Sequence, residues 1–161
     1  MKLSFEPMNL ARATDVAMWS YPPPYRRYGY EDEDPRETVR YLTDPAKRVF
    51  AVLEAGELIA FRSFGEDGQV RGGQYPDGFL DTGGGLRPDL TGRGRGGPVL
   101  QCGLRFAKNQ FGMNRFRVTI ADFNLRAQSV CRKVGFSVQS TFRRKPDGEP
   151  FSIYTIELNA T

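Results

Sequence analysis

Residues 86–97 read Leu86-Arg87-Pro88-Asp89-Leu90-Thr91-Gly92-Arg93-Gly94-Arg95-Gly96-Gly97, and glycine occupies four of the last six positions. A strand-like run, Phe79-Leu80-Asp81-Thr82, precedes this segment, and a helical pattern begins at Pro98. A glycine-rich turn between a strand and a helix exposes main-chain N–H groups at the positive end of the helix dipole. Such a turn suits an anion, and Arg93 and Arg95 add positive charge. The segment therefore predicts a loop that binds phosphate or pyrophosphate.

The spacing excludes two common phosphate-binding motifs. A P-loop requires Lys followed by Ser or Thr after its last glycine, whereas Gly97 is followed by Pro98 and Val99. The glycines also do not follow the G-x-G-x-x-G spacing of dinucleotide-binding folds. The remaining alternative to an anion-binding loop is a surface turn rich in glycine and arginine.

The chain after this loop continues in a regular alternation of elements. Apolar residues recur with helical spacing from Pro98 to Phe111, and residues 116–121 alternate as a strand. Asn124 then opens a second helix that ends at Gly135-Phe136. The apolar stripe of this second helix consists of Ala127, Val130, Cys131 and Val134. The predicted order is strand, glycine loop, helix, strand, asparagine, helix and Gly-Phe.

Two motifs within this order resemble the GNAT superfamily of acetyl-CoA-dependent N-acyltransferases. One is the loop Thr91-Gly92-Arg93-Gly94-Arg95-Gly96, and the other is an Asn-x-x-Ala…Gly-Phe signature made by Asn124, Ala127, Gly135 and Phe136. The resemblance covers Phe79 to Phe136, and the amino-acid sequence of residues 86–92 is similar to that of small bacterial members of the group. It implies a single α/β (α+β) domain over residues 1–161, with helices on both faces of a mixed, mostly antiparallel sheet of about six to seven strands.

The resemblance also implies acetyl-CoA as a cosubstrate, without a metal, and gives residues their roles. Main-chain N–H groups of the loop would bind the pyrophosphate, the strand ending at Leu86 would pair with the pantetheine arm, and Asn124 would bind the pantetheine or the acetyl end. Glycines at 83–85 favour a bulge or a close approach in that strand. Thr91 stands where the family usually has Gln or Arg, so that contact is absent or is supplied by a loop arginine. The coenzyme-binding residues are therefore Leu86, Thr91, Gly92, Arg93, Gly94, Arg95, Gly96, Gly97 and Asn124.

Cys131 occupies the position where many family members have a tyrosine that protonates the departing thiolate. A thiol has a reference pKa of about 8.5 and is capable of that proton transfer. Alternatively, Cys131 is a small core residue beside Val130 and Val134. A third reading needs no protein acid, because the thiolate is itself a moderate base.

A base must also remove a proton from the amine. The chain has no histidine, which excludes histidine-based triads and histidine-ligated metal sites. Carboxylates and main-chain carbonyls remain. Asp81 and Asp122 lie near ends of the two central strands, and Asp81 is the preferred candidate, with a purely structural carboxylate as the alternative.

The remaining segments predict further elements of the sheet and an acceptor region. The expected strands and helices are Leu3–Met8, Asn9–Trp19, Pro35–Leu42, Val49–Leu53, Leu58–Phe64, Val138–Arg143 and Phe151–Leu158. An aromatic segment precedes the acidic run Glu31-Asp32-Glu33-Asp34. Its rings are candidate contacts for an ammonium group, and the alternative is that they cover the core. The candidates for substrate contact are Trp19, Tyr21, Tyr25 and Tyr28.

Composition restricts the class of protein. The 161 residues carry a net charge of +4, include two cysteines, and contain no apolar run long enough to span a membrane. The cysteines indicate neither a disulfide framework nor a metal site, and the amino terminus lacks a secretory region, so we expect a cytoplasmic protein. Nucleic-acid binding is disfavoured because no such motif accompanies the arginines.

The function implied by the resemblance is transfer of an acetyl group from acetyl-CoA to a primary amine, of a small molecule or a protein amino terminus, by direct attack. The alternative is a GNAT-fold module that binds acyl-CoA without turnover, as a sensor or partner, because the family tyrosine is replaced. A homodimer is compatible with the resemblance.

Overall fold

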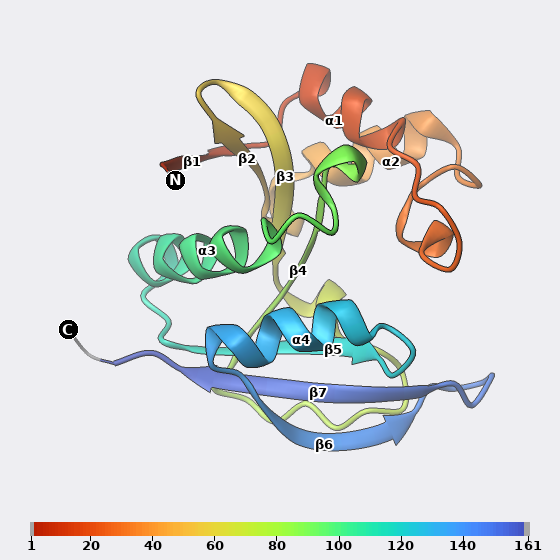
Figure 1. The fold of residues 1–161 in the computed structure, drawn as a ribbon, viewed down its shortest axis with the longest axis vertical. Coiled ribbons are helices and arrows are strands. Elements are labelled where there is room, and N and C mark those ends of the chain that lie inside the picture. Colours follow the sequence, from red (N-terminus) through yellow and green to blue (C-terminus); the bar gives the residue numbers. More distant parts are fainter. Residues whose placement is uncertain (1, 160–161) are drawn as a thin grey trace. The chain divides into compact units, whose positions relative to one another are not determined.

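A computed structural model describes residues 2–159 (Figure 1). The described residues form two compact units. The first comprises the chain up to Ser63 together with Gly84–Arg95, and the second comprises Phe64–Gly83 together with the chain from Gly96 onward. The boundary falls inside the strand β4 (Leu80–Leu86), so each unit contains part of that strand.

The first unit contains three strands that pair in sequence order. They are β1 (Leu3–Pro7), β2 (Val49–Glu54) and β3 (Glu57–Phe64). β2 pairs antiparallel with both neighbours, and it joins β3 through a tight hairpin at Ala55-Gly56. The helices of this unit are α1 (Leu10–Ala17) and α2 (Pro35–Thr43), with short 3-10 turns η1 (Arg26–Tyr28), η2 (Pro45–Lys47) and η4 (Pro88–Leu90).

Local sequence determines where α1 and α2 begin. The Asn9 side chain accepts a hydrogen bond from the Arg12 N–H at 2.8 Å, which satisfies a main-chain donor in the first turn of α1. Asp34 caps α2 in the same way, and Pro35 occupies the first turn, where a missing N–H costs little. Side chains of both helices join alternate residues of β2 in one hydrophobic core. The buried members of that core are Met8, Ala13, Val16, Leu42, Val49, Ala51, Leu53 and Phe61.

The second unit contains α3 (Gly96–Phe111), β5 (Arg115–Ala121), α4 (Leu125–Val134), β6 (Ser137–Arg143) and β7 (Pro150–Glu157). Its part of β4 pairs in parallel with β5 at Leu80↔Phe116 and Asp81↔Arg117. β7 lies between β5 and β6 and is antiparallel to both. Over the described residues the strand order is β1-β2-β3-β4-β5-β7-β6.

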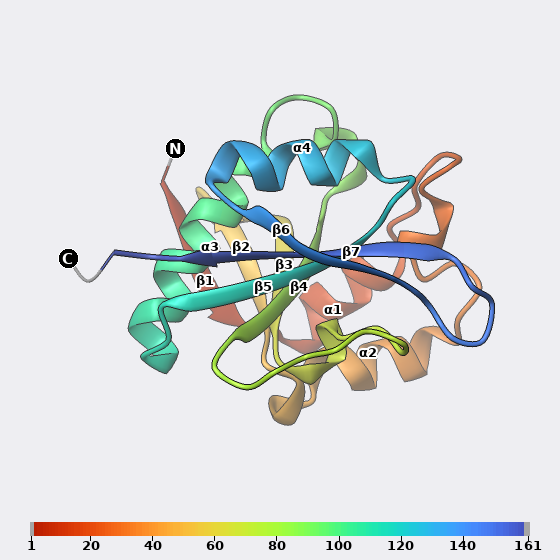
Figure 2. The ribbon, with the colours of Figure 1, turned by 90° about the horizontal axis from the view of Figure 1, so that it is seen from below.

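The segment between β3 and β4, residues 65–79, is an extended connection with one short 3-10 turn, η3 (Glu66–Gly68). Figure 2 shows it on the side of β5 and β7 opposite to α4. The Tyr75 hydroxyl and the Thr119 hydroxyl are 2.8 Å apart, and the Lys145 N–H donates to the Arg71 carbonyl at 3.0 Å. The segment therefore covers a sheet face that would otherwise be open in this unit.

The predicted fold class is confirmed as a mixed sheet of seven strands with four α-helices in the described part of the chain. Each strand and helix expected from periodicity is present, with ends that differ by up to four residues. The prediction contained no element for residues 65–78, whose five glycines and lack of periodicity give no signal. No helix in residues 2–159 has both the length and the apolar character needed to cross a bilayer.

Candidate functional site

The glycine loop predicted to bind phosphate lies between η4 and α3. Gly92 and Gly94 both have φ of +75°, a conformation that side chains with a Cβ rarely adopt. A Cβ built at either residue meets no atom within 4 Å. Backbone conformation rather than packing therefore explains these two glycines, and the main chain at both positions is open to an approaching ligand.

The two arginines of the loop differ in their surroundings. The Arg95 guanidinium donates to a Glu54 carboxylate oxygen at 2.6 Å, and both side chains are about one-quarter to one-third exposed, at 23% and 35%. Arg93 is exposed, as are the glycines on either side of it. Arg95 thus ties the loop to the end of β2, whereas Arg93 is the better placed of the two to meet an anion from solution.

Arg87 stabilises the turn that leads into the loop. Its guanidinium makes two hydrogen bonds to the Asp89 carboxylate, at 2.7 and 3.2 Å, and a third to the Leu58 carbonyl at 3.0 Å. Hydrogen bonding to Arg87 lowers the pKa of the Asp89 carboxyl. These contacts hold η4 against β3 in the first unit.

The last residues of β4 are pressed closely against β3. A Cβ on Gly84 would lie 2.2 Å from the Phe61 carbonyl oxygen, and one on Gly85 would lie 2.8 Å from the Phe61 ring. Glycine is required at both positions because real Cβ contacts are not this short. The prediction that residues 83–85 mark a close approach is therefore confirmed at Gly84 and Gly85.

The aromatic residues predicted to contact substrate do not form one group. Tyr21 is buried, and its hydroxyl donates to the Leu86 carbonyl at 2.6 Å. The Trp19 ring packs on Phe61, with centroids 6.1 Å apart, and joins the hydrophobic core. Tyr25 is half-buried, and Tyr28 is 42% exposed. Tyr25 and Tyr28 therefore keep exposed surface, while Trp19 and Tyr21 pack in the interior of the first unit.

Asp81, the candidate base, is held in a buried ion pair in the second unit. Arg117 donates to both carboxylate oxygens, at 2.7 and 2.9 Å, and the Gln69 amide donates to Oδ2 at 2.9 Å. The two charged side chains are only 4% and 6% exposed. A carboxylate with three donors and almost no exposed surface is poorly placed to take a proton from an amine. The geometry favours a structural role for Asp81.

Arg117 was not among the predicted site residues. It also donates to the Pro76 carbonyl at 2.8 Å and lies over the rings of Tyr75 and Phe79, at 4.8 and 5.4 Å. It therefore fastens residues 65–79 to the sheet. The available signal was a charged residue in a central strand, opposite an acidic residue in the neighbouring expected strand.

Asn124 caps α4. Its side-chain oxygen accepts from the Ala127 N–H at 3.1 Å, which satisfies a main-chain donor in the first turn of the helix. Its predicted contact with coenzyme stays a prediction.

A buried hydrogen-bonded chain supports the turn before α4, and the sequence did not indicate it. The Tyr154 hydroxyl donates to the Gln128 side chain at 2.6 Å, and the Gln128 amide donates to the Asp122 carbonyl at 2.8 Å. The Ser152 hydroxyl donates to the Asp122 carboxylate at 2.6 Å. Burial raises the pKa of Tyr154, so its hydroxyl remains a donor at neutral pH. Asp122, the second candidate base, is thereby engaged in holding the β5–α4 turn.

Cys131 lies one turn after Gln128 on the buried face of α4 and is 4% exposed. This burial favours the reading of Cys131 as a core residue. Among the described residues, no group of three or more His, Cys, Asp or Glu side chains is arranged to hold a metal ion.

Comparison with known proteins agrees with this combination of fold and loop. A model of the acetyltransferase (GNAT) domain matches residues 2–137. The chain therefore belongs to the GNAT acetyltransferase family. A comparison with curated protein sequences finds no match.

Solved structures of the family share the fold at low sequence identity. A GNAT-family acetyltransferase from Bacillus anthracis superposes with a TM-score of 0.77 at 14% identity, over 98% of this chain and 95% of that one. The aminoglycoside acetyltransferase AAC(6')-Ib, in complex with coenzyme A, gives 0.76 at 17% identity, over 97% and 95%. RimL, a ribosomal L7/L12 alpha-N-protein acetyltransferase in complex with coenzyme A, gives 0.71 at 13% identity, over 99% and 96%.

Proposed function

We propose that the protein transfers an acetyl group from acetyl-CoA to a primary amine, by direct attack and without a covalent enzyme intermediate. Membership of the GNAT family supports acetyl transfer in general. The observation that carries the proposal for this chain is the loop at 91–97, whose left-handed glycines leave the main chain open beside the start of α3.

The residues present fit coenzyme A. A cradle for pyrophosphate needs an open main chain. Gly92 and Gly94 are exposed, and a Cβ built at Gly92, Gly94 or Gly97 meets no atom within 4 Å. Arg93 would add charge from the exposed tip of the loop. Leu86 would offer its main chain to the pantetheine arm, and Asn124 would bind near the acetyl end.

When bound, acetyl-CoA supplies a thioester carbonyl that a neutral amine attacks, giving an amide and a free thiol. The residues of this chain act mainly by binding and orienting the reactants, which removes much of the entropic cost of the reaction. With Asp81 and Asp122 hydrogen-bonded and Cys131 buried, we assign none of the three to proton transfer. Solvent is left as the proton acceptor, and main-chain carbonyls can orient the amine by accepting hydrogen bonds from it.

The acceptor is proposed as an amine of a small molecule or of a protein amino terminus. Structural neighbours span that range: AAC(6')-Ib was solved in complex with coenzyme A and kanamycin, and RimL is a ribosomal L7/L12 alpha-N-protein acetyltransferase. In this chain, Tyr25 and Tyr28 are the exposed aromatic candidates for contact with an ammonium group.

The proposal is tested by isothermal titration with acetyl-CoA of the wild type and of Gly94→Asp. Aspartate would place a side chain and a negative charge against the pyrophosphate, so we expect at least a hundredfold loss of affinity. Gly56→Asp is the matched control, because Gly56 has φ of +81° and equally open surroundings in the β2–β3 hairpin. It imposes the same backbone strain and charge and should leave affinity intact.

A thiol-release screen over small amines and amino-terminal peptides then separates catalysis from binding. Release with any amine supports the enzyme. Tight binding with no release under any acceptor supports the acyl-CoA-binding module instead. A wild type that does not bind acetyl-CoA overturns both.

A further prediction concerns the ion pair between Arg95 and Glu54. Glu54→Gln removes a negative charge beside the loop, so the local potential becomes more positive and acetyl-CoA should bind about two- to fivefold more tightly. Titration at low and high salt checks this result, because the gain should shrink as screening increases. Glu57→Gln removes the same charge from the other strand of the hairpin and should have little effect. Weaker binding by Glu54→Gln would show that the pair is needed to shape the loop.

A further inference from the structure

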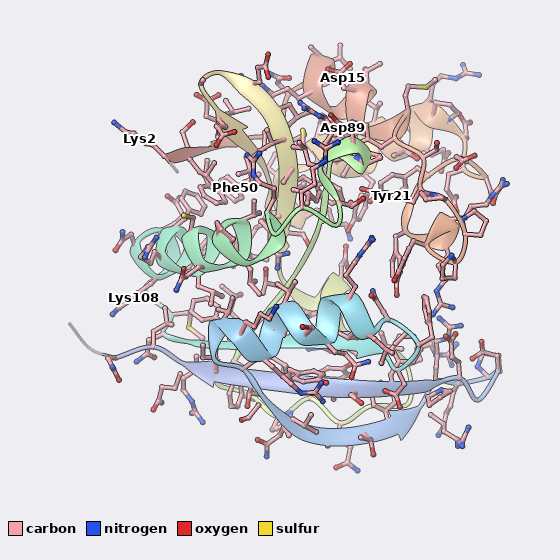
Figure 3. The ribbon with its side chains drawn as sticks, viewed as in Figure 1. Lys2, Asp15, Tyr21, Phe50, Asp89 and Lys108 are labelled. Atoms are coloured by element: carbon pink, nitrogen blue, oxygen red, sulfur yellow. The ribbon has the colours of Figure 1, made fainter. Side chains whose placement is uncertain are left out.

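We propose that Tyr21 is a positioning residue for the pantetheine arm of acetyl-CoA and that it acts through the main chain of Leu86. This inference rests on the proposed function. Tyr21 was expected to contact the amine, but its hydroxyl is engaged within the protein. The donor–acceptor distance to the Leu86 carbonyl is 2.6 Å, and the residue is only 9% exposed. Figure 3 labels Tyr21 beside the segment that follows β4.

The peptide unit between Leu86 and Arg87 is fixed at both of its polar ends. Its carbonyl accepts from Tyr21, and its N–H donates to the Ile59 carbonyl of β3 at 2.8 Å. Because a peptide unit is planar, two opposed hydrogen bonds determine its orientation. The neighbouring N–H of Leu86, which the strand would offer to the coenzyme, can then move only through the dihedral angles of Leu86 itself.

This restraint matters because the preceding residues are glycines. Gly84 and Gly85 are required by the close approach to Phe61, yet glycine leaves the chain more conformational freedom than any other residue. The Tyr21 hydroxyl also lies 3.2 Å from a Cβ built on Gly85, so it is packed against the flexible stretch. The hydrogen bond from the Tyr21 hydroxyl to Leu86 therefore restricts the main chain directly after these two flexible glycines.

The packing of the Tyr21 ring is separate from the hydrogen bond of its hydroxyl, so the two contributions can be tested apart. The ring is held near the main chain of Gly29, where a Cβ would lie 3.4 Å from a Tyr21 ring carbon. Phenylalanine would keep this packing and lose the hydrogen bond to Leu86. Tyr21→Phe is therefore a specific test.

The experiment measures the affinity of Tyr21→Phe for two ligands, acetyl-CoA and adenosine 3′,5′-bisphosphate, which lacks the pantetheine arm. Without this hydrogen bond, binding must itself order the main chain at Leu86, so acetyl-CoA affinity should fall about three- to tenfold. Affinity for the bisphosphate should stay within twofold, because Leu86 does not meet that part of the coenzyme. Tyr41→Phe makes the same change in α2 of the same unit and should alter neither affinity, and thermal unfolding of both variants reports the fold.

The outcomes separate this inference from the proposed function. Selective loss of acetyl-CoA affinity in a folded Tyr21→Phe supports it. Unchanged affinity for both ligands overturns it while leaving the proposed function intact. Equal loss for both ligands, or loss of the fold, gives the hydroxyl a general structural role and also overturns it. A wild type that fails to bind acetyl-CoA overturns the proposed function and this inference together.

Discussion

Asp81→Ala should lower the free energy of unfolding by about 3–5 kcal/mol, because it leaves the Arg117 charge buried without its carboxylate. Arg117 is 4% exposed, and it would keep only its carbonyl and ring contacts on residues 75–79. Equilibrium denaturation of the wild type and the variant measures the difference. The segment 65–79 should also become more accessible to proteases, since Arg117 fastens it to the sheet.

An exposed ion pair provides the control for this prediction. Asp147 accepts from Arg144 at the β6–β7 turn, and these bonds lower its pKa to about 2. Both side chains are substantially exposed, at 48% and 34%, so water replaces the lost contacts in Asp147→Ala and the unfolding midpoint should move far less. Equal stability losses in the two variants would contradict the view that burial of the Asp81 pair dominates.

Asp81→Asn separates the structural role from the catalytic one. Asparagine keeps the shape and one acceptor oxygen, so this variant should fold with an intermediate stability. If Asp81 were the general base, the folded variant would bind acetyl-CoA normally and release thiol orders of magnitude more slowly. We expect instead that any fall in turnover parallels the loss of folded protein, as measured at several temperatures.

The sequence predicted the parts of this molecule that depend on neighbours along the chain. Glycine at 92 and 94, the cap at Asn124 and the alternation of residues 116–121 are local signals, and each corresponds to an observed feature. Strand and helix periods are set within a few residues, so the elements from β4 to α4 could be placed without the structure.

The roles that could not be predicted depend on contacts between distant residues. Tyr21 and Leu86 are 65 positions apart, and Arg95 and Glu54 are 41 apart, so no local pattern connects them. Alternation placed Arg117 on the polar face of its strand, which suggests exposure. That face is covered by residues 65–79. A segment without hydrophobic periodicity carries no sequence signal that predicts its packing on a sheet. The sequence places Arg117 and Asp81 in neighbouring strands, but their burial is recognisable only once the covering segment is in place.

Gly84→Ala should destabilise the first unit by about 3 kcal/mol, the upper end of the usual range for overpacking. The added Cβ would lie 2.2 Å from the Phe61 carbonyl oxygen and 2.9 Å from a carbon of the Arg62 side chain. A flexible side chain can move aside, but the main-chain oxygen of a central strand moves only if β3 and β4 separate. Denaturant unfolding measures the loss of stability. Opening of the β3–β4 pairing can be followed by hydrogen exchange of the Arg87 amide, which donates to the Ile59 carbonyl across the same two strands.

Gly97→Ala is the matched comparison, and it should have the opposite sign. Gly97 lies in the first turn of α3, no atom lies within 4 Å of its added Cβ, and its φ is not in the left-handed region. Replacing such a glycine reduces the freedom of the unfolded chain and should raise stability by about 0.4–1 kcal/mol. The change in unfolding free energy on replacing glycine by alanine thus distinguishes a glycine required by strand contact from one with open surroundings. If Gly84→Ala were as stable as Gly97→Ala, β4 would not be pressed against β3 at this point, and the restraint on Leu86 by Tyr21 would lose its structural basis.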